Sequence, residues 1–252
     1  MTFKVYIPAR YQSSRLPGKL LLEVAGKTVL AHVIENARHS GATEIVVATD
    51  DERIAEVAES LNTLAILTSA EHESGTDRIA EAVMINGERD DQIIVNVQAD
   101  EPLLPAQVMT QVADILLRNP NSEMASVCEP IKNLDDLTDP NICKVVRDEM
   151  QRALYFSRAP IPYCRDRADG DAIENLLQAS RRHVGLYAYR VGFLRRYVKL
   201  PISSFEHLEK LEQLRALAAG CELIVEDAIA ECGIGIDTQS DFIRFCEHVA
   251  AN

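Results

Sequence analysis

Residues 44–61 read EIVVATDDERIAEVAESL, and this stretch decides the fold. It opens with an apolar run rich in β-formers, EIVVATD, which ends in acidic residues and predicts a buried strand over 44–50. Residues 51–61 then place apolar side chains at helical spacing behind an acidic first turn, which predicts an amphipathic helix. A buried strand followed at once by a helix is the repeating unit of a parallel α/β sheet.

The same unit recurs on both sides of this stretch. Short apolar runs predict further buried strands at FKVYI (3–7), TLAILT (63–68) and QIIVNVQ (92–98). Apolar residues at helical spacing predict helices over 28–39, 75–85 and 105–118. Because these strands do not alternate apolar and polar residues, both faces of the sheet must be covered. We therefore predict an α/β fold with a mostly parallel sheet flanked by helices.

After about residue 120 the pattern changes. Strand-like segments with weak helical signal between them follow at MASVCEPI (124–131), ICKVVRD (142–148), ALYFSR (153–158) and HVGLYAYR (183–190). We predict a small antiparallel lobe over 120–205, within one domain that spans 1–252. The polar stretch 164–182 is interpreted as a mobile loop, and FEHLEKLEQLRALAAG (205–220) as one long helix.

Composition limits the classes of function. With 252 residues, 47% of them hydrophobic, and a formal net charge of −13, the chain has the makeup of an ordinary globular protein. An acidic protein is poorly suited to bind nucleic acid or an anionic membrane surface. Residues 1–22 are the exception, because they hold Lys4, Arg10, Arg15 and Lys19 and no acid. This basic segment indicates a small, highly charged anion as ligand.

Cysteine spacing and the N-terminal residues bear on the cellular compartment. The six cysteines form no C-x-x-C pair and no zinc-like spacing. The first residues, MTFKVYIPAR, lack the apolar stretch of a signal peptide, and no apolar run reaches the roughly 18 residues of a membrane helix. We expect reduced thiols, a cytoplasmic location and no membrane span.

The loop after the first predicted strand, PARYQSSRLPGK (8–19), carries three cations. Ligands of an open α/β sheet bind outside the carboxyl ends of the strands, where this loop lies. It is not a Walker A loop, because Ser13 stands where Gly is required and Leu20 follows Lys19 where Ser or Thr is required. A solvated surface loop is the alternative. The position favours a polyphosphate site, since the loop has no acid of its own and would repel itself without an anion.

Two further motifs end in carboxylates. NVQADEP (96–102) places Asp100 at the end of a predicted strand, and GIGIDT (233–238) places Asp237 before the final helix. Carboxylates are hard oxygen ligands of the kind that hold Mg²⁺ together with substrate phosphates. The alternative for Asp100 is a turn residue before Pro102. For Asp237 taken alone, an N-cap of the last helix, by Asp237 or Thr238, is favoured.

Eight motifs, in order from end to end of the chain, resemble those of one enzyme family. They are PARYQSSRLPGK, ATDDERI, HESGTDR, VNVQADEP, ALYFSRAPIP, RHVGLYAYR, LEKLEQLR and GIDT. The family is the 3-deoxy-manno-octulosonate (KDO) cytidylyltransferases. The loop motif is also similar to that of sialic acid cytidylyltransferases, whereas SGTDR, YFSRA, RHVGLYAYR and LEQLR together favour the KDO branch. The chain departs from the family pattern at Ala99, Leu20 and Tyr163, where the pattern has Gly, Pro and Trp.

The resemblance implies a fold like that of nucleotide-diphospho-sugar transferases and a homodimer, with a lobe over 120–205 that binds the sugar or forms the dimer. It implies transfer of CMP from CTP to the anomeric hydroxyl of KDO, with release of pyrophosphate, for lipopolysaccharide biosynthesis in the cytoplasm. Two alternatives stay open. One is a cytidylyltransferase for another acidic sugar, such as an amino-substituted KDO or a sialic acid. The other is a non-catalytic nucleotide-binding protein that keeps the fold.

The resemblance also implies roles for single residues. Catalysis falls to Lys19, Arg10 and Arg15. CTP contacts Pro8, Ala9, Arg10, Ser14, Arg15, Lys19, Ser74 and Gly75. The sugar acid contacts Arg78, Gln98, Arg158, His183, Tyr187 and Glu212, and Mg²⁺ binds Asp100 and Asp237. From the residues alone, His183 and Tyr187 also fit a packed aromatic face, and Arg158 an ordinary ion pair.

Overall fold

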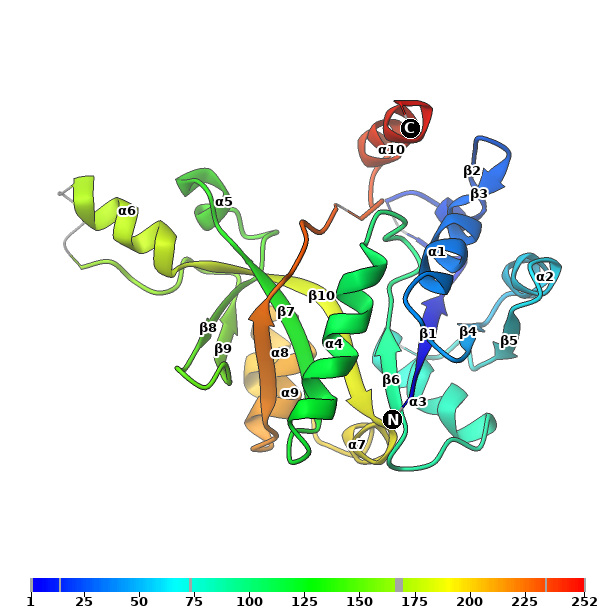
Figure 1. The fold of residues 1–252 in the computed structure, drawn as a ribbon, viewed down its shortest axis with the longest axis horizontal. Helices are drawn as coiled ribbons and strands as arrows, with labels where there is room; N and C mark the ends of the chain where they lie inside the picture. The colour runs from blue at the N-terminus through cyan, green and yellow to red at the C-terminus, as the bar shows by residue number, and fades with distance from the viewer. Residues whose placement is uncertain (1, 14, 73, 166–169, 234, 252) are drawn as a thin grey trace.

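A central sheet runs through the molecule, with helices on both of its faces (Figure 1). The computed structural model describes residues 2–13, 15–72, 74–165, 170–233 and 235–251. In spatial order the main strands are β11 (Leu223–Asp227), β7 (Met124–Pro130), β10 (Arg181–Arg190), β6 (Ile93–Asn96), β1 (Phe3–Ala9), β4 (Ile45–Thr49) and β5 (Leu64–Leu67). Only β10 runs antiparallel to its neighbours along this order of described strands. The predicted α/β fold with a mostly parallel sheet is confirmed.

Two apolar cores lie on opposite faces of the sheet, because successive strand residues point to opposite sides. Val5 and Ile7 of β1 join one core, and Tyr6 between them joins the other. The first core is covered by α1 (Val29–Arg38), α2 (Glu52–Ser60), α4 (Ala106–Arg118) and α10 (Gln239–Ala251). The second is covered by α3 (Gly75–Ile85), α7 (Val191–Tyr197) and α9 (Gln213–Ala218). Burial on both faces explains why these strands are unbroken apolar runs in the sequence.

The helices of the first half form close to their predicted ends, and side chains cap them. Thr28 accepts a hydrogen bond from the Ala31 amide at the start of α1, Asp51 accepts from Arg53 at the start of α2, and Ser74 caps α3. Helices α2 and α3 follow strands β4 and β5, so their capped ends lie at the sheet edge where ligands bind. A short 3₁₀ turn, η1 (Lys19–Leu21), and a hairpin of β2 (Glu23–Val24) and β3 (Lys27–Thr28) separate β1 from α1.

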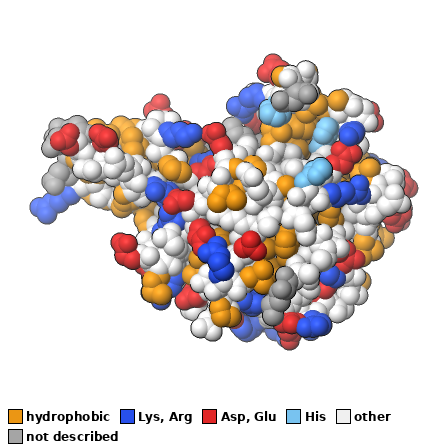
Figure 2. Space-filling model, viewed as in Figure 1, with side chains coloured by type: hydrophobic (Ala, Val, Ile, Leu, Met, Phe, Trp, Pro, Cys, Tyr) orange, Lys and Arg blue, Asp and Glu red, His pale blue; other side chains and the backbone are white. Residues whose placement is uncertain are grey.

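Residues 120–205 supply β7 and β10 to the main sheet and also a part that projects from it. Strands β8 (Lys144–Arg147) and β9 (Ala153–Ser157) pair antiparallel, and β8 also pairs with β10. Helices α5 (Leu134–Thr138) and α6 (Gly170–Ala179) extend this part into the arm seen in Figure 2. The interpretation of 164–182 as a mobile loop is therefore wrong for the α6 residues. Leu176 anchors this helix, because it is buried against Ile131 and Leu137.

The single helix predicted over 205–220 is also wrong. Helix α8 (Ser204–Glu209) ends at Lys210, whose φ of +55° is left-handed, and α9 begins three residues later. A left-handed residue ends an α-helix, and the usual sequence signal, glycine, is missing here. The break places Glu212 against α3, where Thr76 Oγ1 donates to Glu212 Oε2 at 2.8 Å.

Two surface observations bear on the predicted lack of membrane and nucleic-acid partners. Within the described ranges, no helix combines the length and the apolar character needed to cross a bilayer. On the face drawn in Figure 2, Lys and Arg side chains are interspersed with Asp and Glu. The part of that face which the structure describes therefore carries no broad basic patch of the kind that tracks a nucleic-acid backbone.

Candidate active site

The basic loop, residues 8–19, lies over the carboxyl ends of β1, β4 and β6. The loop and these strand ends line a cavity of about 830 Å³ that is open to solvent. From the loop, the lining includes Arg10, Tyr11, Gln12, Ser13, Arg15, Pro17 and Lys19. From the sheet edge it includes Pro8, Asp50, Gln98, Ala99 and Asp100, and Asp237 joins from the segment before α10. A cavity of this volume can hold a nucleotide.

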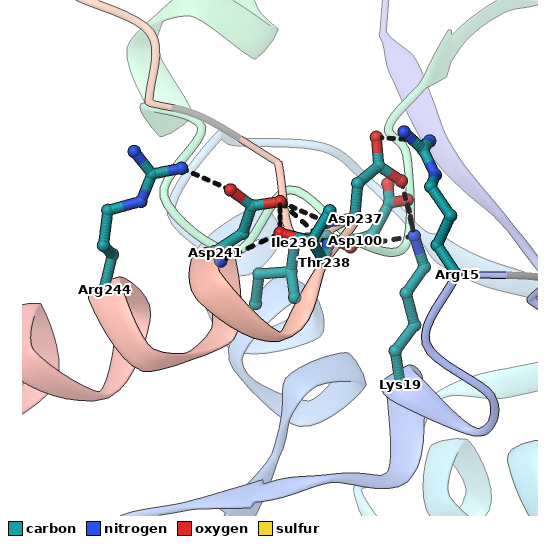
Figure 3. A network of polar contacts seen from close by, with 8 residues as sticks. All are labelled: Arg15, Lys19, Asp100, Ile236, Asp237, Thr238, Asp241 and Arg244. Atoms are coloured by element: carbon teal, nitrogen blue, oxygen red, sulfur yellow. Dashed lines mark hydrogen bonds and ion pairs between the residues drawn. The ribbon is translucent and has the colours of Figure 1, made fainter.

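Lys19 joins the two predicted metal ligands. Its Nζ donates to Asp100 Oδ2 at 2.5 Å and to Asp237 Oδ1 at 3.0 Å (Figure 3). It also donates to the carbonyl of Ile236 at 2.8 Å. Arg15 contacts the other carboxylate oxygen of Asp237, with Nη2 and Oδ2 2.9 Å apart. Because the two aspartates stand 81 and 218 residues from Lys19 in the chain, the fold alone brings this cluster together.

These contacts set the charge of the site. Burial by itself lowers the pKa of Lys19, but the charges and hydrogen bonds of Asp100 and Asp237 outweigh it and raise the pKa above its ordinary value. Lys19 is therefore protonated at physiological pH. The expectation that the cations of the loop lack compensating acids is corrected here, because Asp100 and Asp237 reach them from distant segments.

Asp237 and Thr238 have separate contacts, and the N-cap interpretation of this motif is confirmed for Thr238. Thr238 N and Oγ1 both donate to Asp241 Oδ2 at 2.8 Å, and the Asp241 amide donates back to Thr238 Oγ1 at 3.3 Å. This reciprocal arrangement caps α10. The Asp237 carboxylate points away from the helix, toward Lys19 and Arg15 (Figure 3).

Arg78 lines the cavity of about 830 Å³ beside the basic loop, called the larger cavity below, although it is predicted as a sugar contact. Its Nη1 donates to Thr68 Oγ1 at 2.6 Å and its Nη2 to Asp50 Oδ2 at 3.0 Å, and only 1% of the side chain is exposed. Asp50 is absent from the predicted site. It gave the same signal as Asp100, an acid at the end of an apolar strand, so that rule applied to EIVVATD would have found it.

Glu101 is a second residue that the sequence analysis leaves out. Burial, followed by the charges of Asp100 and Asp237, raises the pKa of Glu101 to about 8, although Arg182 opposes the shift. The side chain lies against the segment before α10, where a Cβ at Gly235 would meet Glu101 Cγ at 3.4 Å. A third carboxyl group, with a raised pKa, thus stands beside the aspartate pair.

The other predicted CTP residues differ in position. Pro8 and Gly75 face the larger cavity, and a Cβ at Gly75 would lie 3.3 Å from Pro8 Cγ, so glycine lets α3 approach β1 this closely. Ala9 is fully buried in the core, and Ser74 is buried as the cap of α3. Ser14 lies outside the described residues.

A second cavity, of about 370 Å³, adjoins the first and shares Arg10, Gly75 and Gln98 with it. Tyr187 and Glu212 line this smaller cavity. Burial raises the pKa of both groups, which keeps the Tyr187 hydroxyl protonated at neutral pH. Three of the predicted sugar contacts, Gln98, Tyr187 and Glu212, therefore meet in one place.

His183 is not among the described residues that line either cavity. Its Nε2 lies 2.9 Å from Ser126 Oγ, and its ring stands edge-on to Phe156 with 4.9 Å between ring centroids. The ring also contacts Tyr187, at 5.2 Å between centroids. Burial lowers the pKa of His183 to about 3, so the imidazole is neutral. His183 therefore belongs to an aromatic row that supports Tyr187.

Arg158 is likewise missing from both linings among the described side chains. Its Nε donates to the Glu209 carbonyl at 2.8 Å and its Nη1 to the Pro140 carbonyl at 2.9 Å. The Arg158 amide donates to Glu209 Oε2 at 2.9 Å. The two contacts with Glu209 connect the end of β9 to the end of α8, just before the left-handed residue that separates α8 from α9, and the contact with Pro140 reaches the segment before β8.

The donor chemistry of Asp100 and Asp237 fits Mg²⁺. This ion takes one or two carboxylates and completes its shell with water and substrate phosphates. The two carboxylates already share one positive charge, the Lys19 ammonium. Among the described residues, no cluster of three or more His, Cys, Asp or Glu is arranged to hold a metal.

A basic loop after β1 that contacts paired carboxylates at the carboxyl edge of a mostly parallel sheet is an arrangement suited to a nucleotidyltransferase. The family model of the cytidylyltransferases matches residues 5–227. The 3-deoxy-manno-octulosonate cytidylyltransferase of Thioalkalivibrio sulfidiphilus (strain HL-EbGR7) is 50% identical over 244 residues, which cover 97% of each chain. The chain belongs to the 3-deoxy-manno-octulosonate cytidylyltransferase family.

Two further comparisons agree. The 3-deoxy-manno-octulosonate cytidylyltransferase 1 of Hydrogenovibrio crunogenus (strain DSM 25203 / XCL-2) is 48% identical over 247 residues, covering 97% of this chain and 95% of that one. A solved structure of CMP:2-keto-3-deoxy-manno-octonic acid synthetase complexed with CTP matches with a TM-score of 0.90 and 37% identity, over 100% of this chain and 99% of that one. The likeness therefore extends over the whole chain.

Proposed function

We propose that this protein transfers CMP from CTP to the anomeric hydroxyl of KDO and releases pyrophosphate. The observation that carries the proposal is the contact of Lys19 with both Asp100 and Asp237 under the basic loop. Relatives named for KDO cytidylyl transfer and a structural neighbour solved with CTP support it.

The chemistry is a displacement at phosphorus. The 2-hydroxyl oxygen of KDO bonds to the α-phosphorus of CTP, and the bond from that phosphorus to the α,β-bridging oxygen breaks. Pyrophosphate leaves with the bridging oxygen and its electron pair, and the hydroxyl proton passes to solvent water. Such reactions are catalysed mainly by positioning and by charge stabilisation. Arg10, Arg15 and Lys19, which all line the larger cavity, offset charge on the α-phosphate and on the leaving pyrophosphate.

The two adjoining cavities suit the two substrates. The larger one takes CTP along the basic loop, and the smaller one takes KDO beside Tyr187 and Glu212. Arg10 and Gln98 border both cavities, so they lie where the reacting atoms of the two substrates meet. His183 acts on the sugar side through its ring contact with Tyr187.

We assign Mg²⁺ to Asp100 and Asp237. When bound, Mg²⁺ lowers the pKa of a coordinated hydroxyl and offsets phosphate charge. The protein itself holds the two carboxylates in place before any ligand arrives, because Lys19 bonds to both and Arg15 bonds to Asp237.

A homodimer, a cytoplasmic location and a place in lipopolysaccharide biosynthesis are proposed from the family resemblance. We assign the dimer contact to the part of residues 120–205 that projects from the main sheet, which comprises the β8–β9 pair and the arm with α6 (Figure 1). Leu154 and Tyr163 in this projecting part are 62% and 74% exposed, and a second copy would cover such apolar surface. Sedimentation equilibrium should give the mass of two chains.

The test is pyrophosphate release from CTP with a panel of sugar acids. A site that hydrogen-bonds substrate hydroxyls can reject a poorly matched analogue by up to ~10⁴-fold. We expect kcat/KM for KDO to exceed that for N-acetylneuraminate by a large factor. Equal use of the two sugars would mean that the substrate is a broader class of acidic sugars and not KDO in particular. Release with none of them, together with tight CTP binding, would indicate a non-catalytic nucleotide-binding protein.

A further inference from the structure

The motif ATDDERI (48–54) contributes Arg53, which touches the basic loop from outside the cavity. The guanidinium carbon of Arg53 lies 3.6 Å from the centre of the Tyr11 ring. This is a cation–π contact, in which the positive charge faces the negative face of the ring. Tyr11 is among the described residues that line the larger cavity, and Arg53 is not. Arg53 can therefore affect a ligand there only through its neighbours.

Asp51 orients the exposed side chain of Arg53. Its Nε donates to Asp51 Oδ1 at 2.9 Å and its Nη2 to Asp51 Oδ2 at 2.7 Å. Asp51 is fixed in turn as the cap of α2, because its Oδ1 also accepts the Arg53 amide at 3.0 Å. A two-point contact of this kind sets the plane of the guanidinium. The first turn of α2 thus presents a fixed cation to the loop.

The Tyr11 ring also lies against Gly18, on the far side of the loop. Gly18 has a φ of +67°, and a Cβ built there would come within 3.3 Å of the ring. The Gly18 amide donates to the Tyr11 carbonyl at 3.3 Å, which closes the loop on itself. Lys19 follows directly. The contacts therefore run from α2 through Arg53 and Tyr11 to Gly18 and the residue that holds Asp100 and Asp237.

We propose that Arg53 and Tyr11 are positioning residues for the triphosphate site. The fixed guanidinium holds the Tyr11 ring against Gly18, and the ring keeps the loop in the shape that presents Arg10, Arg15 and Lys19 to CTP. The inference rests on the proposed function, because it takes CTP as the ligand. It assigns the ATDDERI motif a structural role in CTP binding, whereas no step of the proposed reaction uses that motif. An exposed cation–π contact corresponds to an effect of about two- to five-fold on binding.

The experiment measures CTP binding by calorimetry and KM for CTP and KDO by turnover. Arg53→Ala and Tyr11→Leu should each raise Kd and KM for CTP by about two- to five-fold. The KM for KDO and the melting temperature should stay unchanged. Tyr11→Phe keeps the ring and should raise Kd for CTP less than Tyr11→Leu does. In the Tyr11→Leu background, Arg53→Ala should have no further effect, because the contact is already lost.

Arg89→Ala is the matched control. Arg89 makes the same side-chain contact with an aspartate two residues away, its Nε donating to Asp91 Oδ1 at 3.0 Å, at the opposite edge of the sheet. It should leave CTP binding unchanged. Equal losses from Arg53→Ala with and without Tyr11 would overturn the proposal, as would a Tyr11→Phe variant as weak as Tyr11→Leu. Because Kd needs no turnover, wild-type protein that binds CTP but forms no product would defeat the proposed function and leave this inference to be decided by the variants.

Discussion

Lys19 is the residue on which most of the site depends, because it is both a cation for the nucleotide and the partner of two carboxylates. Lys19→Ala should lower kcat by on the order of 10²-fold or more, the scale of losing one charge-stabilising donor. It should also leave Asp100 and Asp237 without their shared ammonium. We therefore expect Mg²⁺ to raise the melting temperature of the variant more than that of the wild type. Turnover assays measure the first effect and calorimetric melting measures the second. Near-native turnover of Lys19→Ala would show that the loop is not the phosphate site.

His183 gives the native state a pH dependence of known sign. Its pKa falls from 6.5 to about 3 on folding because the ring is buried, so the unfolded chain binds more protons below pH 6.5. The residue has no effect on stability above that pH and costs stability as the pH drops from 6.5 toward 3. His183→Gln should remove a cost of about 2 kcal/mol at pH 5. Urea unfolding of both proteins at pH 7.5 and pH 5 measures it, and the same pH dependence in both would contradict a buried, neutral His183.

At the scale of secondary-structure elements, two neighbouring residues at the start of α10 have different roles: Thr238 caps the helix, and Asp237 contacts Lys19 and Arg15. Thr238→Ala removes the hydroxyl that caps the helix and should cost about 1 kcal/mol, seen as faster hydrogen exchange in α10. Thr238→Ser should behave like the wild type in this respect. Turnover should stay within a few-fold, because Asp237 keeps its contacts with Lys19 and Arg15. Loss of activity as large as in Asp237→Asn would mean that the cap and the cluster form one unit.

Most elements with a strong local pattern could be predicted from the sequence, and the others could not. Strands β1, β4, β5 and β6 and helices α1 to α4 are set by runs and periods of apolar residues, which a short window shows. Helix α6 was missed because the prediction treated the whole of 164–182 like its polar start, although Ile173, Leu176 and Leu177 stand at helical spacing. The division between α8 and α9 was missed because Lys210 takes a left-handed conformation without a glycine to signal it.

At the scale of the whole molecule, the sequence could predict which residues form the site but not all of their partners. The basic loop and Asp100 were identifiable because they follow strands at the ligand-binding edge. Asp237 was identified only through the family resemblance, since its own motif favoured an N-cap of the last helix. Their mutual contacts join segments up to 218 residues apart, which no local pattern shows. For the same reason Arg158 and His183 were expected in the sugar cavity, whereas their described side chains bond to Glu209 and Ser126 outside it.

The central claim is that Lys19, Asp100 and Asp237 form one reaction centre for cytidylyl transfer. The most direct measurement is pyrophosphate release with saturating CTP, KDO and Mg²⁺ by the wild type, Asp100→Asn, Asp237→Asn and the double variant. We predict that each single change abolishes turnover, that the double variant is no worse than either single one, and that excess EDTA stops the wild type. Turnover in EDTA, or a double variant far slower than both single variants, would contradict a shared centre.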